Sequence, residues 1–278
     1  MRLEETATSS GICIYSSSKG RLLVVAGGPG ISSRAYRECF EPLSKSARLV
    51  FWDFRGTGKT PELGPFGAEY DYQDLLQVLR HVGEPLVILS HSYGSVLALR
   101  LALEFPEKVK GLIFVGGALS FSSVFENLME RKRKNLSETD FKALLAMMEA
   151  IRAGDTSDAL SRDFMRREVL NQLHRPSAIQ IHKFCEICEL NLKAYCGNQD
   201  FLALDYTNQA REITAPTLVI SGADDLIVPR EFSSKIANLV RNAHHEVIEI
   251  APEPAGHGLP LSKCEAYNRV YEQPCGSS

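Results

Sequence analysis

Short, continuously apolar runs recur along this chain, separated by longer stretches whose apolar residues follow helical spacing. Runs that are apolar throughout, rather than alternating with polar residues, are typical of parallel strands covered on both faces. Strand and helix in repeated alternation predict an α/β fold with a doubly wound, mostly parallel sheet. The predicted strands span residues 22–26, 48–52, 86–89, 112–115, 217–220 and 247–250, with a more peripheral strand over 12–15.

Amphipathic stretches between these strands predict helices over 69–81, 92–104 and 231–240. Pro106 ends the second of these helices, because proline supplies no backbone N–H for a helical hydrogen bond.

The alternation breaks between Leu119 and Asn208, where the sequence shows helical patterns and no convincing strand. Ser137 begins one helix with a pattern that resembles a capping box, and Gly154 ends it. Further helices are predicted over 157–173 and 177–190. We therefore predict a core domain formed by residues 1–118 and 209–278, interrupted by a helical cap at 119–208.

Composition argues against several classes of protein. The net charge is −3, without the basic excess of a nucleic-acid-binding surface or a polybasic tail for a membrane surface. The N-terminus lacks the apolar core of a secretory signal, and no apolar run is long enough to span a bilayer. Seven irregularly spaced cysteines do not suggest a disulfide framework, so a reducing cytoplasm is the expected location.

Cys185 and Cys188 form a Cys-x-x-Cys pair on a stretch that is predicted to be helical. Since no second pair completes a zinc set, we interpret them as structural rather than as metal or redox groups. We expect neither a metal nor an organic cofactor.

The most specific chemical signal is Ser90-His91-Ser92-Tyr93-Gly94, where a buried strand meets a helix. A serine on such a tight turn points its hydroxyl out of the sheet, and the turn needs small neighbours. The pattern therefore predicts a nucleophile elbow with Ser92 as the nucleophile. The alternative is a helix that simply begins with a serine cap.

A second strand runs into a glycine-rich bend, Gly27-Gly28-Pro29-Gly30. Glycines let backbone N–H groups approach a developing oxyanion closely. The backbone N–H groups of Gly28 and Tyr93 are the candidate donors. A phosphate-binding loop is the alternative, but the glycine and lysine spacing of such loops is missing.

Acidic residues follow two other strands. Asp224 and Asp225 stand after the strand at 217–220, where a carboxylate can orient a histidine and stabilise its charged form. Solvated loop carboxylates are the alternative for both. After the strand at 48–52, Asp53 and Arg55 are expected to form an ion pair that shapes the loop.

His257 follows the last predicted strand and is flanked by glycines, after the acid in chain order. His244 and His245 are expected just before that strand, as structural or surface residues, and His91 is expected to pack under the turn. The order serine, acid, histidine, each at the carboxyl end of a strand, predicts a catalytic triad of Ser92, Asp225 or Asp224, and His257.

These motifs resemble the α/β-hydrolase fold family over nearly the full chain. The resemblance is carried by residues 53–60, 90–94, 105–109, 222–229 and 255–257. It implies Asp225 rather than Asp224 as the acid, and a helical cap after the sixth strand of the sheet. Gly-Gly-Pro-Gly at 27–30 is similar to the proline-iminopeptidase branch. However, Ala26 replaces the usual histidine before those glycines, and the elbow differs, so the aminopeptidase substrate is not carried over.

We therefore predict a hydrolase that cleaves a small carboxylic ester, thioester or amide through an acyl-enzyme on Ser92. Acyltransferase or lyase chemistry with the same triad, a proline-iminopeptidase-like aminopeptidase, and a binding protein with a vestigial site remain alternatives.

The residues that select the substrate are expected within the cap. Glu186 and Glu189 could meet an amine, although solvation is the simpler expectation. The basic run at 131–134 could bind an acidic substrate tail or an acyl-carrier partner, or form a solvated helix face. The aromatic and methionine residues available for an apolar pocket are Phe121, Phe125, Met147, Met148, Phe164, Phe184, Tyr195 and Phe201.

Overall fold

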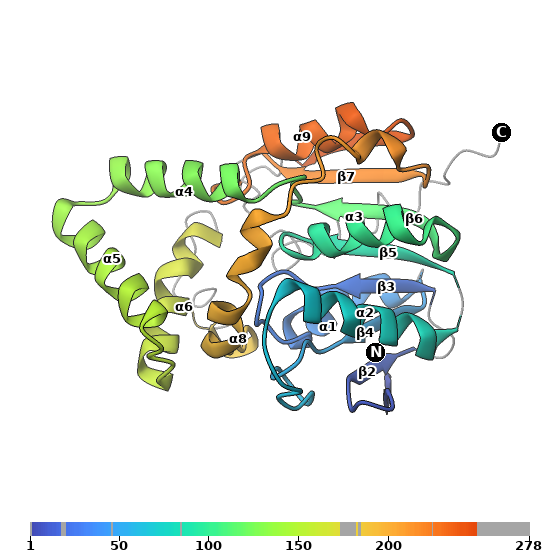
Figure 1. Ribbon diagram of the computed structural model, residues 1–278, viewed down its shortest axis with the longest axis horizontal. Helices are drawn as coiled ribbons and strands as arrows, with labels where there is room; N and C mark the ends of the chain where they lie inside the picture. The colour runs from blue at the N-terminus through green and yellow to red at the C-terminus, as the bar shows by residue number, and fades with distance from the viewer. Residues whose placement is uncertain are drawn as a thin grey trace.

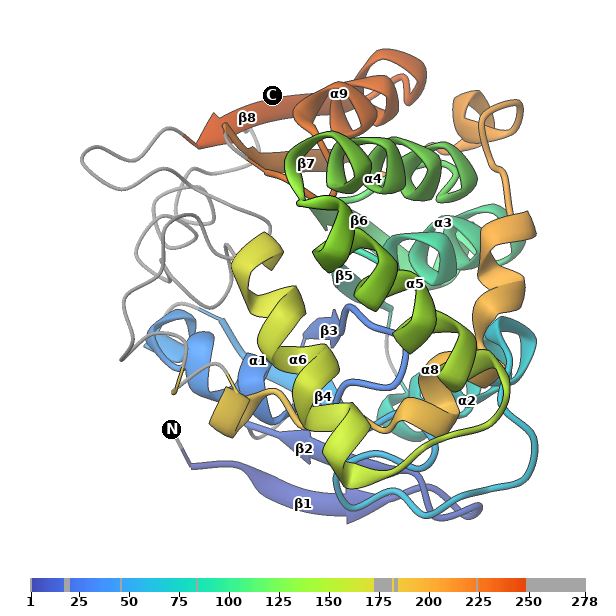
Figure 2. The same ribbon diagram turned by 90° about the vertical axis from the view of Figure 1, so that its left-hand side faces the viewer.

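The computed structural model describes residues 2–17, 21–45, 47–83, 85–172, 182, 185–223 and 225–248. Eight strands of the described residues form one sheet in the order β1-β2-β4-β3-β5-β6-β7-β8 (Figures 1 and 2). β1 and β2 pair antiparallel, as do β2 and β4, and the other pairs are parallel. The strands are β1 Glu4–Ala7, β2 Cys13–Ser16, β3 Leu22–Val25, β4 Leu49–Trp52, β5 Leu86–His91, β6 Val109–Val115, β7 Thr217–Gly222 and β8 Ala243–Ile248.

The predicted α/β class and the mostly parallel sheet are confirmed. Every residue of β3 and β4 is buried, as expected for central strands covered on both faces. β1 was not predicted, because its four residues are all exposed and carry no apolar pattern.

The last strand differs from its prediction. β8 begins at Ala243, so the predicted strand at 247–250 overlaps only its end. His244 and His245, expected before the strand, lie within it. The error arises because this part of β8 is only partly buried and carries histidines and a glutamate instead of an apolar run.

The three predicted core helices are present as α2 Ala68–Val82, α3 Gly94–Glu104 and α9 Arg230–Leu239. A further helix, α1 Arg34–Cys39, follows the glycine-rich bend and was not predicted. It is only six residues long, and its N-cap residue, Ser33, makes no side-chain capping bond, so little in the sequence marks it.

Between β6 and β7 the described residues form helices, and their isolated bridges, Ile31 with Leu190 and Ser120 with Asp205, belong to no strand. Residues 119–208 are called the helical insertion below. Its predicted helix start is confirmed, because Ser137 accepts a hydrogen bond from the Asp140 N–H, and Gly154 follows with φ 93°. Half of the predicted segment at 177–190 lies outside the described residues; residues 182 and 185–187 are helical, whereas 188–190 are not. The α-helices are α4 Ser122–Asn135, α5 Glu138–Arg152, α6 Asp158–Gln172 and α8 Leu192–Gly197.

The insertion lies over one end of the sheet (Figures 1 and 2). Its later part is fastened to the core by polar contacts. Asn191 Nδ2 donates to the Gly56 carbonyl at 2.7 Å, and the Asp200 carboxylate accepts the Ala68 N–H at 2.9 Å. Asp200 thereby caps α2, whose own N-cap, Gly67, has no side chain to do so.

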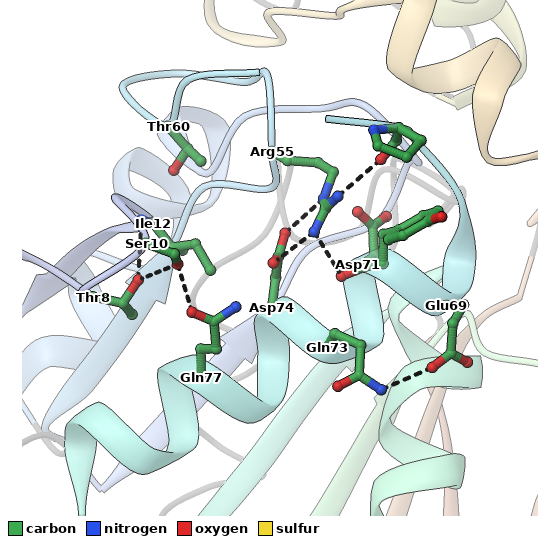
Figure 3. A network of polar contacts seen from close by, with 12 residues as sticks. Thr8, Ser10, Ile12, Arg55, Thr60, Glu69, Asp71, Gln73, Asp74 and Gln77 are labelled. Atoms are coloured by element: carbon green, nitrogen blue, oxygen red, sulfur yellow. Dashed lines mark hydrogen bonds and ion pairs between the residues drawn. The ribbon is translucent and has the colours of Figure 1, made fainter. Parts of the chain in front are cut away.

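The loop after β4 is fixed by buried polar contacts, but not by the expected Asp53–Arg55 pair. Arg55 instead forms a two-pronged ion pair with Asp74 on α2, with both N–O distances 2.8 Å (Figure 3). The Asp53 oxygens are already taken by the Tyr15 hydroxyl and by backbone N–H groups, including that of Ser33. Asp74 offers both of its oxygens to the planar guanidinium, which favours this pairing.

Replacing Asp74 by Ala should lower the free energy of unfolding by about 3–5 kcal/mol, because it leaves the buried Arg55 guanidinium without its carboxylate. Urea unfolding followed by circular dichroism measures the change. Lys142→Ala on α5 is the matched control: it removes an exposed ion pair with Glu138 and should cost about 0.5 kcal/mol. Equal effects of the two substitutions would contradict a structural role for the buried pair.

Candidate active site

Ser92 lies where β5 meets α3, in the conformation that a nucleophile elbow requires. Its φ is 48°, and it is the one described residue other than glycine with a positive φ. Such a conformation is costly for a residue with a Cβ and persists only where the surroundings enforce it. The Ser92 N–H donates to the Val115 carbonyl on β6 at 3.0 Å, and the Ser95 N–H donates to the Ser92 carbonyl at 2.8 Å.

The elbow also requires a glycine at 94. A Cβ there would lie 2.6 Å from the Val25 carbonyl oxygen and 2.7 Å from that of Ala26. Both contacts are with backbone, so neither can be relieved by rotating a side chain. The small residue at the other end of the motif, Ser90, is completely buried.

A cavity of about 150 Å³ opens at Ser92, between the core and the helical insertion. Gly28 and Tyr93, the predicted oxyanion residues, line it together with Ser92. Of the aromatic residues expected to form the substrate pocket, five line it: Phe121, Phe125, Phe164, Tyr195 and Phe201. Met148 lines a second cavity, Met147 is buried among apolar residues, and Phe184 lies outside the described residues.

The second cavity, of about 420 Å³, lies within the helical insertion. The two cavities share the lining residues Phe125, Leu128, Phe164, Tyr195 and Leu202, so they adjoin. Lys132 and Arg152 line the second cavity.

Asp225 stands just beyond the end of β7 and is buried. Its Oδ1 accepts the N–H groups of Ile227 and Val228 at 2.9 and 2.8 Å, which fixes the carboxylate. β7 is two strands from β5 in the sheet, a separation of about 10 Å, which an imidazole hydrogen-bonded on both sides can span. Ile227 lines the Ser92 cavity. Asp224 and His257 lie outside the described residues.

His91 is not packed under the turn as expected but lines the Ser92 cavity. Its Nδ1 lies in hydrogen-bond contact, 2.7 Å, with the hydroxyl of Tyr36 on α1. The same hydroxyl accepts the Gly27 N–H at 2.6 Å. The expectation was wrong because it could not include Tyr36, a partner from a helix that the sequence did not reveal.

Behind the elbow, the fully buried Tyr93 side chain reaches a carboxyl group on α2. Its hydroxyl donates to Asp71 Oδ2 at 2.8 Å and contacts Asn198 Oδ1 of the helical insertion at 3.4 Å. Burial raises the pKa of Asp71 to about 7, although the hydrogen bond from Tyr93 opposes the rise. Tyr93, next to Ser92 in the turn, is therefore hydrogen-bonded to a carboxyl group that becomes charged only near neutral pH.

The remaining candidate groups have local partners or buried positions. Burial raises the pKa of the Cys188 thiol to about 12, and it also raises that of Cys185, so both favour the unreactive thiol form. Glu189 is not simply solvated, because it pairs with Arg34 at 2.9 Å, whereas Glu186 is exposed. At the end of α4, Lys134 pairs with Glu130.

In the described part of the chain, no three or more histidine, cysteine, aspartate or glutamate side chains gather as a metal site would require. Its helices likewise include none with the length and hydrophobicity needed to cross a bilayer.

Sequence reasoning missed Tyr36, Asp71 and Asn198. Tyr36 stands shortly after the glycine-rich bend, and the serines at 32–33 could have suggested a helix start there. Asp71 and Asn198 lie far from Tyr93 in the chain and carry no motif, so their roles emerge only from tertiary contacts.

Comparison with known proteins agrees with this architecture. The family model described as alpha/beta hydrolase fold matches residues 20–263. The chain is 29% identical to a proline iminopeptidase of Clostridioides difficile, over 76% of each chain. It is 28% identical to a 2-hydroxy-6-oxononadienedioate/2-hydroxy-6-oxononatrienedioate hydrolase of Cupriavidus pinatubonensis, over 87% of this chain and 82% of that protein. An alpha/beta fold family hydrolase of Bacillus anthracis superposes with TM-score 0.73 at 18% identity, covering 97% of this chain and 98% of that one.

Asp71→Asn should change how stability depends on pH. The folded-state pKa of about 7 lies above the usual 3.8, so the folded protein binds the proton more tightly. This carboxyl group therefore costs stability increasingly as pH rises from about 4 to 7, with no further change above that range. Asparagine removes this loss, so the variant should gain stability relative to the wild type as pH rises from 5 to 8. Urea unfolding at several pH values measures this difference. A difference in unfolding free energy between the two proteins that stays constant from pH 5 to 8 would contradict the prediction.

Proposed function

Because this chain belongs to the alpha/beta hydrolase fold family, we propose that it is a serine hydrolase that cleaves a small carboxylic ester, thioester or amide. The observation that carries the proposal is Ser92, held at φ 48° on a strand-to-helix turn and facing a cavity. A helix that merely began with a serine cap would not require this conformation, because a capping residue normally takes extended backbone angles.

In the proposed mechanism, His257 accepts the Ser92 proton as the serine oxygen attacks the substrate carbonyl carbon. The N–H groups of Tyr93 and Gly28 stabilise the oxyanion. Asp225, fixed by two backbone N–H groups, orients His257 and stabilises its charged form. The tetrahedral intermediate expels the alcohol, thiol or amine, which takes the proton from His257. Water then attacks the acyl-enzyme, with His257 as base, and releases the acid and free Ser92.

We further propose that the helical insertion acts as a cap that selects the substrate. The cavity at Ser92 is lined mainly by aromatic and aliphatic side chains, which suits an apolar acyl group. The adjoining cavity extends this space within the insertion and brings Lys132 and Arg152 to its wall. An acyl chain that ends in a carboxylate would therefore meet positive charge at its far end. A free small molecule fits this arrangement, and an acyl-carrier partner is not needed to explain it.

The similarity to a proline iminopeptidase favours a second candidate, removal of an N-terminal residue from a peptide. An aminopeptidase needs an acidic group for the substrate amine, and Glu189, one of two expected candidates, is engaged by Arg34. The ester, thioester or amide hydrolase is therefore the better supported proposal. An acyltransferase or a lyase would use the same serine. Analysis of the reaction products distinguishes these two activities from hydrolysis.

The central test is labelling with a fluorophosphonate, followed by peptide mapping. We expect the wild type to carry the label on Ser92 and to hydrolyse chromogenic esters, thioesters or anilides. Ser92→Ala should remove the label and lower kcat by roughly 10⁴- to 10⁶-fold. Ser44→Ala, at a serine that lines neither described cavity, is the control and should retain both properties. Full turnover by Ser92→Ala, or a label on another residue, would overturn the proposal.

Preference for an anionic acyl chain is tested with p-nitrophenyl hexanoate and the mono-p-nitrophenyl ester of adipic acid, which differ only in a terminal carboxylate. We expect the wild type to prefer the adipate ester in kcat/KM. The double variant Lys132→Ala, Arg152→Ala should lose about 10-fold of that preference, since a charged hydrogen bond contributes about 1.5–3 kcal/mol. Arg133→Ala, on the same helix but outside both cavities, should leave it unchanged. No change in preference in the double variant would remove these residues from substrate selection.

A further inference from the structure

Three groups from separate parts of the chain meet beside Ser92. The Tyr36 hydroxyl accepts the Gly27 N–H at 2.6 Å and lies 2.7 Å from His91 Nδ1. Tyr36 comes from α1, Gly27 from the bend after β3, and His91 from the last position of β5. One phenol oxygen thus joins the glycine-rich bend to the residue that precedes the nucleophile.

Gly27 is packed closely against its hydrogen-bonding partner Tyr36 and against His91. A Cβ on Gly27 would lie 2.6 Å from His91 Nδ1, 2.9 Å from the Tyr36 hydroxyl and 3.2 Å from Ser92 Cβ. Gly27 therefore sits directly against the tyrosine, the histidine and the nucleophile. Any side chain at this position would push the bend away from the elbow.

The bend needs such an anchor. Gly28 and Gly30 have φ of 137° and 80°, and glycine backbone has more conformational freedom than that of any other residue. A backbone N–H stabilises an oxyanion only when it is aimed in advance at the place where the charge develops.

We propose that Tyr36 and His91 form a clasp that holds the Ala26–Gly27 peptide, so that the next peptide along the chain is fixed with its Gly28 N–H facing the oxyanion. Both are positioning residues, and the inference rests on the proposed serine hydrolase function.

The surroundings suit this role. Tyr36 and His91 are only 5% and 7% exposed, so water competes little for their hydrogen bonds. Burial raises the pKa of the Tyr36 phenol far above its usual value, so the phenol keeps its proton. A protonated phenol can accept from Gly27 and share a second hydrogen bond with His91 at the same time.

Tyr36→Phe tests the clasp, because it removes one oxygen atom and keeps the ring. We expect kcat to fall 10- to 100-fold, since loss of an oxyanion donor outright costs roughly 10²- to 10³-fold, while KM changes less than about threefold. The affinity for a boronic acid that mimics the tetrahedral intermediate should fall by the same factor as kcat. Tyr72→Phe is the matched control: it also removes a buried tyrosine's hydrogen bond, to Glu104, and should retain wild-type kcat.

His91 gives an independent second test. In His91→Asn the amide can occupy the place of Nδ1, so most of the activity should remain, whereas His91→Leu should lose as much kcat as Tyr36→Phe. The double variant Tyr36→Phe, His91→Leu should lose no more than either single variant, because both break one unit. Wild-type kcat in Tyr36→Phe, or additive losses in the double variant, would overturn the clasp.

The two proposals fail in different ways. If wild-type Ser92 takes no fluorophosphonate and the protein hydrolyses none of the substrates, the proposed function is wrong. If the wild type is labelled and active but the Tyr36 and His91 variants match it, the clasp alone is wrong.

Discussion

The structure depends on one close approach of backbone, where the end of β3 meets the start of α3. The carbonyls of Val25 and Ala26 press against Gly94 so tightly that no Cβ fits between them. This approach brings the glycine-rich bend and the Ser92 turn together at the carboxyl ends of the neighbouring strands β3 and β5. Ser92 keeps its positive φ because the strands and the helix packed around the turn enforce this conformation.

The elements that the sequence predicts well are those whose signal lies within a single segment. The central strands are apolar at every position because helices cover both faces, so they can be recognised without knowing their neighbours. β1 and α1 lack such a signal, because one is an exposed edge strand and the other is a short helix without a side-chain cap. The strand-to-helix turn at Ser92 could be predicted because a tight turn demands small residues nearby in sequence. The roles of Tyr36 and Asp71 could not, because their partners arrive from distant segments.

The later part of the helical insertion is joined to the core by polar contacts. This part, around α8, contacts the core through Asn191, Asn198 and Asp200. Asn198 contacts Tyr93, the residue directly after Ser92, and Asp200 caps the N-terminus of α2. The same segment that walls the cavity therefore also supports the elbow and a core helix. Changes in this segment would alter the geometry at Ser92 as well as the shape of the cavity.

The exposed strand β1 has a consequence for how molecules of this protein meet one another. It stands at the open margin of the sheet, where a strand from another copy could extend the hydrogen-bonded ladder. Charged side chains lie along it, Glu4 and Glu5 among them, with Glu5 paired to Lys59, and charges on an edge strand hinder its pairing with another chain. These charges disfavour edge-to-edge pairing of two copies along this strand.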